Sequence, residues 1–97
     1  MGKNFSPKYL NYIHSEEWRE KSKRFRRATG DRCVLFPFLR SNHAHHLTYK
    51  NLESEQFVRD CVGLNAWSHD LVHFLYKCRI KVVLDLYLRC SATVLWL

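Results

Sequence analysis

The stretch from His43 to His73 reads HAHHLTYKNLESEQFVRDCVGLNAWSHDLVH and holds five of the six histidines of this 97-residue chain. His69 and His73 are four residues apart in a part with helical apolar spacing, so their rings leave one helix face a turn apart. That spacing lets two imidazoles bind one cation. The pair marks a candidate metal site, and two half-exposed surface histidines are the alternative interpretation.

His45 and His46 stand in a short run, residues 43–47, that is typical of a β-strand. Adjacent strand residues face opposite sides, so one ring can join the metal while the other performs a different task. His43 shares the side of His45, as a further contact or as a surface residue. A strand His-His followed by a helical His-x-x-x-His is more specific than either pair alone.

Residues 7–29 are predicted to form a helix with a break inside it. A serine cap and a proline at its start, and a glycine after it, are the usual helix boundaries. Ser15 is followed by two glutamates, which is the pattern of a second helix start. We therefore expect the break near His14 and Ser15.

The middle of the chain is predicted to contain a hairpin and a loop. Residues 33–39 (CVLFPFL) and 43–47 are expected to be two strands around a polar turn. Residues 48–64 are expected to form a loop with one helical turn at 54–59. A helix then runs from residue 65 or 68 to about 78.

Residues 80–97 are predicted to form an amphipathic helix rather than a membrane span. Lys81, Asp85 and Arg89 interrupt the apolar run and form one charged stripe at a spacing of four. We expect the apolar face beside it to be buried: Val83, Leu84, Tyr87, Leu88, Val94 and Leu95. The expected partner is the apolar stripe of the first helix, at Tyr12, Ile13 and Trp18.

The formal net charge is +7, and the first 40 residues supply most of it, with ten basic and four acidic residues. Length and composition fit one globular domain with a modest core and exclude a multidomain enzyme. One run has five basic residues in seven: Lys21, Lys23, Arg24, Arg26 and Arg27. An ordinary exposed helix end mixes signs, so backbone phosphates are the better partner. A nuclear-localisation or RNA-binding role fits the same run.

Four cysteines, Cys33, Cys61, Cys78 and Cys90, include no Cys-x-x-Cys pair. The first residues lack the apolar core of a secretory signal, so we expect reduced thiols and a cytoplasmic, reducing location. Cys61, Cys78 and Cys90 are predicted to be small core residues.

Together these residues resemble the HNH, or ββα-metal, nuclease core. The His-His-Leu-Thr-Tyr run at 45–49 is similar to one branch of that family, as are the leading helix with Tyr9 and Trp18 and the sequence RDCVGLNAWSHDLVH at 59–73. The resemblance implies a small α+β fold. It places a ββα-metal core at about residues 9–76 of a single domain, 1–97, with a helix before it and an amphipathic helix at about 80–97 after it.

The resemblance also assigns a role to each site residue. His45, His69 and His73 would hold one divalent cation, and His46 would be the general base that activates water. Asp60 falls where the family has a central asparagine that holds the base loop by hydrogen bonds. Imidazole ligands suit Zn²⁺, Ni²⁺ or Mn²⁺ better than Mg²⁺, and the identity of the ion stays open.

The zinc knuckles of that family are largely missing. Cys33 remains, but Phe36, Asn65 and Ser68 stand at the other three cysteine positions, so we expect no structural zinc. An apolar plug is expected in its place: Phe36, Pro37, Phe38, Leu64 and Trp67.

The function implied is metal-dependent endonucleolytic hydrolysis of DNA with low sequence specificity. We expect a monomer, with a homodimer as the alternative, no small-molecule cofactor and no stable membrane insertion. A catalytically inactive, basic nucleic-acid-binding protein of the same fold is the second hypothesis. The third is an interaction protein whose last helix binds a partner or a membrane surface.

Overall fold

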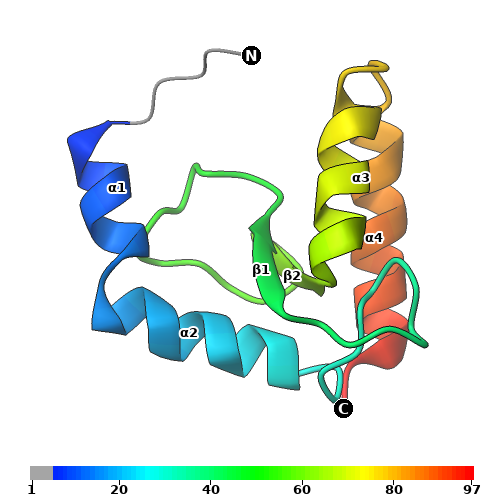
Figure 1. Cartoon of the computed structure of the whole chain (residues 1–97), viewed down its shortest axis with the longest axis horizontal. Coiled ribbons are helices and arrows are strands. Elements are labelled where there is room, and N and C mark those ends of the chain that lie inside the picture. Colours follow the sequence, from blue (N-terminus) through cyan, green and yellow to red (C-terminus); the bar gives the residue numbers. More distant parts are fainter. Residues whose placement is uncertain (1–5) are drawn as a thin grey trace.

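The computed structural model describes residues 6–97 and has four helices around a two-stranded antiparallel sheet (Figure 1). In chain order the elements are α1 (Pro7–Ile13), α2 (Glu16–Arg27), β1 (His43–His46), β2 (Cys61–Leu64), α3 (Ala66–Tyr76) and α4 (Lys81–Leu95). Residues 1–5 of the expected domain lie outside the described part. The predicted α+β class is confirmed, and β1, β2 and α3 follow one another in the order of a ββα unit.

α1 and α2 begin at the expected caps. The hydroxyl of Ser6 accepts a hydrogen bond from the backbone N–H of Tyr9, and that of Ser15 accepts one from Trp18, both at 3.2 Å. Ser15 has an extended backbone, with ψ 159°, so the chain turns there and the helix predicted over 7–29 is split as expected. Two glutamates in the first turn of α2 and three arginines in its last turn complement the helix dipole.

The sheet brings both strand histidines beside β2. His45 stands opposite Val62 and His46 opposite Cys61. All four residues of β2 are buried. Gly63 lies close to Ser41: a Cβ at this position would meet the Oγ of Ser41, which would have to shift.

The strand predicted over 33–39 is wrong. These residues form a tight turn, in which the N–H of Leu39 donates to the carbonyl of Phe36 at 2.8 Å. Only Arg32 and Arg40, at the two ends, pair as an isolated bridge. Pro37 favours a turn here because it has no N–H to give to a strand ladder.

The partner of β1 lies instead at the end of the predicted loop. The run CVGL at Cys61–Leu64 is short and contains a glycine, so its sequence does not stand out as a strand. The helical turn expected at 54–59 is also absent; within that range Val58 has a φ of 74°, outside the helical region.

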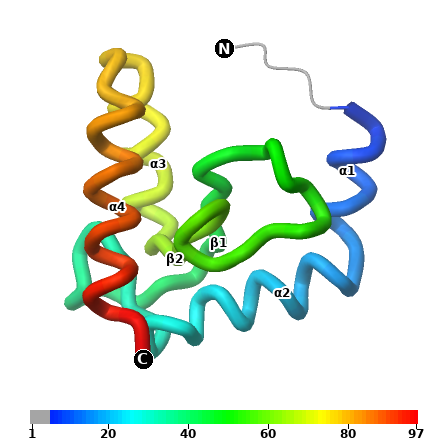
Figure 2. The backbone as a smooth tube through the Cα atoms, turned by 180° about the vertical axis from the view of Figure 1, so that it is seen from behind, coloured from blue at the N-terminus to red at the C-terminus, as the bar shows by residue number. Residues whose placement is uncertain are grey.

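One core lies between the sheet and the pair α3–α4. Its buried side chains are Cys33, Val34, Leu47, Val62, Leu64, Val72, Leu84, Leu88 and Ala92. Burying one side chain of the size of Leu88 stabilises the fold by roughly 1.5–3 kcal/mol. α1 and α2 lie on the other side of β1, and both views place α4 beside α3 and far from α1 (Figure 2).

α4 turns only part of the predicted face toward the core, with Leu84 and Leu88 buried as expected. Its buried residues are Leu84, Asp85, Leu88 and Ala92. Three of the side chains predicted to be buried are exposed: Val83, Tyr87 and Val94. The helix packs on α3 and β2 rather than on Tyr12, Ile13 and Trp18.

Backbone carbonyls explain why the charged stripe of α4 lies inward. The ammonium of Lys81 donates to the carbonyl of Leu47 at 2.9 Å, and the Nε of Arg89 donates to the carbonyl of Val58 at 3.3 Å. Both carbonyls belong to the irregular connection between β1 and β2, where buried backbone acceptors need donors. An apolar face could not supply them.

Two of the three cysteine predictions are also wrong. Cys61 is buried as expected, but Cys78 and Cys90 are exposed, because they lie in the turn after α3 and on the outward side of α4. All four cysteines lie in the described part and are free thiols. Among the described residues, no helix has the length and apolar character to cross a bilayer.

The apolar plug expected beside the turn at 33–39 is only partly formed. Leu64 is fully buried, and Phe36 packs against the rings of Phe38 and Trp67, with centroids 5.9 and 5.6 Å away. Phe38 and Trp67 are themselves exposed, as is Pro37.

Candidate metal centre

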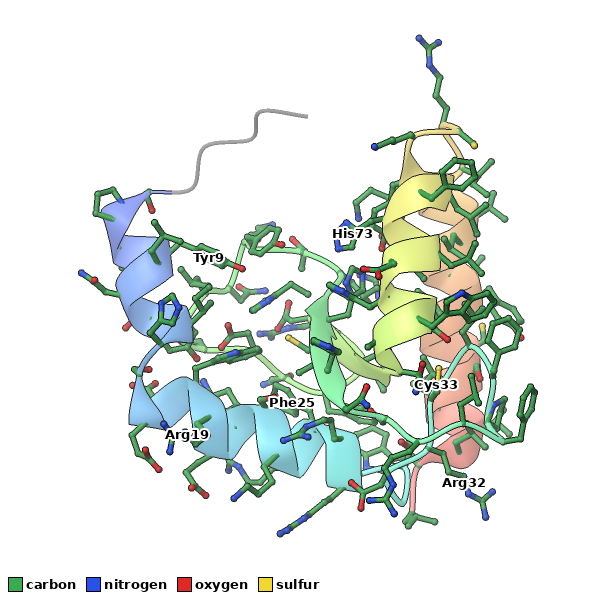
Figure 3. The ribbon with its side chains drawn as sticks, viewed as in Figure 1. Tyr9, Arg19, Phe25, Arg32, Cys33 and His73 are labelled. Carbon is green, nitrogen blue, oxygen red and sulfur yellow. The ribbon has the colours of Figure 1, made fainter. Side chains whose placement is uncertain are left out.

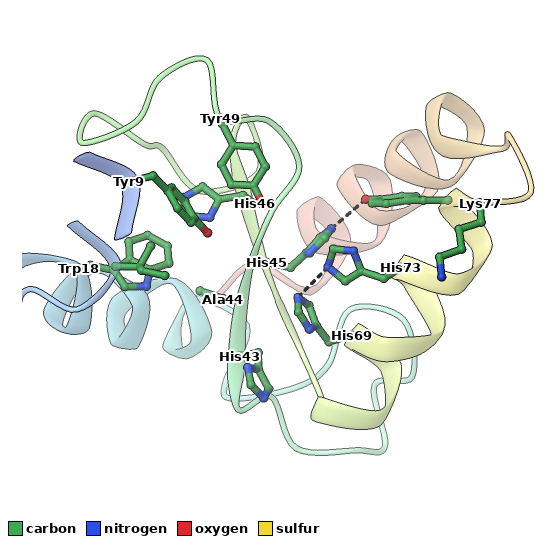
Figure 4. Close-up of a pocket in the computed structure, with 12 residues that line it drawn as sticks. Tyr9, Trp18, His43, Ala44, His45, His46, Tyr49, His69, His73 and Lys77 are labelled. Atoms are coloured by element: carbon green, nitrogen blue, oxygen red, sulfur yellow. Dashed lines mark hydrogen bonds between the residues drawn. The ribbon is translucent and has the colours of Figure 1, made fainter. Parts of the chain in front are cut away.

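The three histidines predicted as metal ligands lie together. His45 comes from β1, and His69 and His73 come from one face of α3 (Figure 4). One nitrogen of each ring lies within 4.8 Å of the other two. α3 begins directly after β2, where the side chain of Asn65 caps it by accepting from the N–H of Trp67 at 3.0 Å. The short link from strand to helix therefore sets the HxxxH pair beside His45.

The spacing of these nitrogens suits a small cation. The Nε2 atoms of His69 and His73 are 3.2 Å apart. Two nitrogens bound to one tetrahedral Zn²⁺ at about 2.0–2.1 Å lie about 3.3 Å from each other. The α3 pair thus already has the separation of two ligands on one ion, and His45 completes a set of three that leaves further coordination positions open.

Electrostatics keep the rings of His45 and His69 neutral at pH 7. Burial, together with the neighbouring imidazoles, lowers the pKa of His45 from 6.5 to about 2. Burial and the nearby His73 lower the pKa of His69 to about 4. A neutral imidazole has the lone pair that a metal needs, so both residues are ready to act as ligands.

His46 occupies a different environment on the other side of β1. Its Nε2 lies 2.8 Å from the carboxylate of Glu55. Its ring stacks on Trp18, with centroids 4.6 Å apart, and on Tyr49, with centroids 4.9 Å apart. The imidazole is thus held on both faces and oriented at one nitrogen.

Glu55 is the centre of a buried hydrogen-bond network. The hydroxyl of Tyr12 donates to it at 2.8 Å and the ammonium of Lys21 at 3.1 Å, in addition to the contact with His46. Burial alone would raise the pKa of Glu55, but these hydrogen bonds outweigh it and hold the pKa below its usual value. The sequence gives no sign of Glu55, since its three partners come from distant parts of the chain.

The position of Lys21 corrects one site prediction. Lys21 is buried and donates to Glu55 and to the carbonyl of Glu53, so it is not a phosphate anchor. The other four basic residues of the run lie at the surface of α2, fully or partly exposed: Lys23, Arg24, Arg26 and Arg27. None of these four belongs to the described lining of the cavity beside the histidines.

Asp60 holds the loop between the strands. It is fully buried and accepts hydrogen bonds from the side chains of Asn51 and Arg59 and from the backbone N–H of Gln56, at 2.8–2.9 Å. Burial opposes ionisation, yet these donors hold the pKa of Asp60 below its usual value. Asp60 does not line the cavity, so it is a positioning residue for the loop that carries Glu55.

A single cavity of about 670 Å³ joins the two histidine environments. Four consecutive residues of β1 line it, so His45 and His46 both open onto it although they point to opposite sides of the strand. Tyr9 from α1 and His73 from α3 point into this space from opposite sides (Figure 3). His43 stacks on His69, with centroids 5.2 Å apart, at the edge of the same cavity.

No protein-family model, curated protein or solved structure matches the chain.

Proposed function

We propose that this chain is a metal-dependent endonuclease of the HNH, or ββα-metal, type that hydrolyses DNA with low sequence specificity. One observation carries the proposal: the candidate metal ligands His45, His69 and His73 share a cavity with His46, whose ring is oriented by a buried carboxylate. The order β1, β2, α3 is consistent with the ββα arrangement of that resemblance.

His45, His69 and His73 would hold the divalent cation. Bound there, it would supply positive charge to the scissile phosphate and to the leaving oxygen. Three imidazole ligands leave coordination positions open, which a catalytic site needs and a closed structural site lacks.

His46 has the features of a general base. The donors around Glu55 hold it ionised, and an ionised carboxylate can only accept hydrogen bonds. The Nε2 of His46 must therefore carry the hydrogen that it donates to Glu55, and the lone pair of the neutral ring is on Nδ1. Nδ1 then takes the proton from the attacking water. The imidazolium that forms is stabilised by the carboxylate of Glu55, a contribution in keeping with general-base catalysis.

DNA is the substrate that fits the charge of the molecule. The net charge of +7 and the four exposed or partly exposed basic residues of α2 favour a polyanionic backbone. α2 also supplies Trp18 to the cavity, so a strand lying on α2 would have phosphates near His46. Contacts with phosphates carry no base sequence, which accounts for the low specificity.

A second candidate function is DNA binding without cleavage. The observation that favours it is the separation of the basic surface of α2 from the cavity lining, since binding could persist without a working metal centre.

Cleavage of supercoiled plasmid tests the proposal. Wild-type protein is incubated with Mn²⁺, Ni²⁺, Zn²⁺, Mg²⁺ or EDTA, beside His46→Ala and the control His14→Ala, an exposed histidine at the end of α1. We expect nicking with at least one ion, none in EDTA, loss in His46→Ala and no change in His14→Ala. Retarded plasmid without nicking under every condition would select the binding function instead.

A further inference from the structure

A chain of hydrogen bonds connects the candidate metal ligand His45 to α4. The Nε2 of His45 lies 2.8 Å from the hydroxyl of Tyr76, the contact drawn from His45 in Figure 4. The same hydroxyl donates to the carboxylate of Asp85 at 2.5 Å. Lys81 forms an ion pair with the other oxygen of Asp85 at 2.5 Å. Asp85 is buried, although the sequence placed it on an exposed stripe.

Counting hydrogens along this chain gives each bond a direction. Asp85, paired with Lys81, is a carboxylate and can only accept. The single hydrogen of the Tyr76 hydroxyl therefore goes to Asp85, and its oxygen must accept from His45. Nε2 of His45 carries the hydrogen, and the lone pair of that ring is on Nδ1.

We propose that Tyr76 and Asp85 are positioning residues of the metal centre, which hold His45 in the tautomer and ring orientation that offer its Nδ1 lone pair to the cation. This inference rests on the proposed metal centre. It gives α4, which the HNH resemblance does not cover, a part in the site. Partners of this kind, one bond beyond a ligand, typically change metal affinity about 10–100-fold when removed.

Tyr76 lies on the same face of α3 as the two helical candidate ligands. His69, His73 and Tyr76 follow one another on α3 at spacings of four and three, so all three groups face the cavity. The phenol thus reaches the ligand from the same helix face as the other two imidazoles. Removing its hydroxyl leaves the apolar ring in place and deletes both the acceptor for Nε2 of His45 and the donor to Asp85.

The test compares Tyr76→Phe and Asp85→Asn with wild type and with Tyr87→Phe, which removes the same hydroxyl from the exposed side of α4. Isothermal titration calorimetry with Zn²⁺ measures affinity, and nitrogen NMR of the histidine rings in the metal-free protein reports the tautomer of His45. We expect about 10–100-fold weaker binding in Tyr76→Phe and in Asp85→Asn, loss of the Nε2–H tautomer preference, and no change in Tyr87→Phe.

Each failure has its own meaning. Unchanged affinity in Tyr76→Phe, or a wild-type His45 protonated on Nδ1, overturns the positioning role while the metal centre stands. Absence of Zn²⁺ binding by wild type, with the Nε2–H tautomer present, refutes the proposed metal centre instead.

A second and independent observation concerns the opposite side of α4. The outer α4 surface consists of Val82, Val83, Leu86, Tyr87 and Val94. These side chains are 51–83% exposed. The charged residues of the helix, Lys81, Asp85 and Arg89, are all engaged with the body of the fold, so the outer α4 surface carries no charge.

We infer that the outer α4 surface binds a second copy of this chain. Val83, Tyr87, Cys90 and Val94 are spaced by four, three and four, which is the alternation of helices that pack along each other. The five side chains expose on the order of 600 Å², and two such surfaces together reach about 1,200 Å², the lower end of specific interfaces. A two-fold symmetric pair needs only one self-complementary surface. Nucleic acid would find no charge here.

Sedimentation equilibrium from 1 to 200 μM tests this pairing, with Leu86→Glu beside the control Phe38→Glu. Phe38 is an apolar residue on the turn at 33–39 that is more exposed than Leu86, at 84% against 61%. We expect dimers in wild type and in Phe38→Glu and monomers in Leu86→Glu. A short bismaleimide should cross-link Cys90 to Cys90 and not Cys78 to Cys78. A monomeric wild type overturns the inference, and so does a monomer that co-sediments with anionic lipid vesicles.

Discussion

The two sides of β1 place neighbouring histidines in opposite chemical environments. On the side of α3, His45 meets imidazoles and a phenol, and burial lowers its pKa to about 2. On the side of α2, His46 meets the ionised carboxylate of Glu55 and two aromatic faces. The first environment keeps the ring of His45 neutral beside two further candidate ligands, and the second orients the ring of His46 through a carboxylate. Strand alternation alone therefore separates the candidate metal ligand His45 from the proposed base His46.

The largest effect we expect concerns the positive charge on the α2 side. Replacing Lys23, Arg24, Arg26 and Arg27 by serine should weaken DNA binding roughly 10²–10³-fold at low salt and flatten the salt dependence of log K by about three to four units. Fluorescence anisotropy over 25–200 mM salt measures both. The same loss of charge at Arg32, Arg40, Lys50 and Arg79 should have a much smaller effect. Equal effects of the two sets would mean that binding follows net charge and not the surface of α2.

The second effect separates the roles of the two histidines. His46→Ala should lower cleavage by at least about 10²-fold with nearly unchanged metal affinity, because it removes a base and no ligand. His45→Ala should weaken metal binding as well as cleavage. Calorimetry and single-turnover cleavage measure the two quantities. If both variants lose metal equally, the contrast between the sides of β1 is incorrect.

The third effect is a dependence of stability on pH that arises on the α3 side. The pKa of His45 falls from 6.5 to about 2 on folding, so between these values the unfolded chain binds a proton that the folded chain does not. The contribution of His45 to the free energy of unfolding is therefore fully present above pH 6.5. It decreases as the pH falls, and about 2 kcal/mol is lost at pH 5.0. Urea unfolding in EDTA at pH 7.5 and 5.0 should show this loss in wild type and a smaller one in His45→Gln. An identical pH dependence in both would remove His45 as its source.

The smallest effect we expect concerns the carboxylate of Glu55 beside His46. Glu55→Gln keeps the shape of the side chain but removes the negative charge beside His46, so cleavage should fall about 10-fold without a change in metal affinity. The variant also leaves the ammonium of Lys21 buried without its carboxylate. The double variant Lys21→Met with Glu55→Gln should recover thermal stability but not cleavage. Recovery of both would make Glu55 a purely structural partner.

The parts predicted from the sequence are those that local spacing determines. The HxxxH pair needs only helical periodicity, and the break between α1 and α2 needs only the Ser15 cap. The placement of His45 on a strand follows from the short run HAHHL at 43–47. Each of these features depends on residues within one or two turns of chain.

The parts that were missed depend on contacts between distant residues. The sequence does not predict β2 as a strand, because its run is short and contains Gly63, a residue whose contact with Ser41 only the fold brings about. The orientation of α4 depends on carbonyls of the loop between the strands, which accept from Lys81 and Arg89. Likewise, the three partners of Glu55 come from α1, α2 and β1, and no spacing along the chain predicts that they contact the same carboxylate.

The loop held by Asp60 has a consequence for how the chain folds. β1 cannot pair with β2 until residues 47–60 have closed, and closing a flexible segment has an entropic penalty before the strand contacts form. Asp60 binds Asn51, Gln56 and Arg59 within that segment, so part of the closure is local. We expect Asp60→Ala to slow refolding more than it speeds unfolding in a stopped-flow chevron, which would place the loop in the folding nucleus. The two candidate metal ligands of α3, His69 and His73, follow β2 in the chain, so the rate at which this segment closes would also set the rate at which the candidate metal centre assembles.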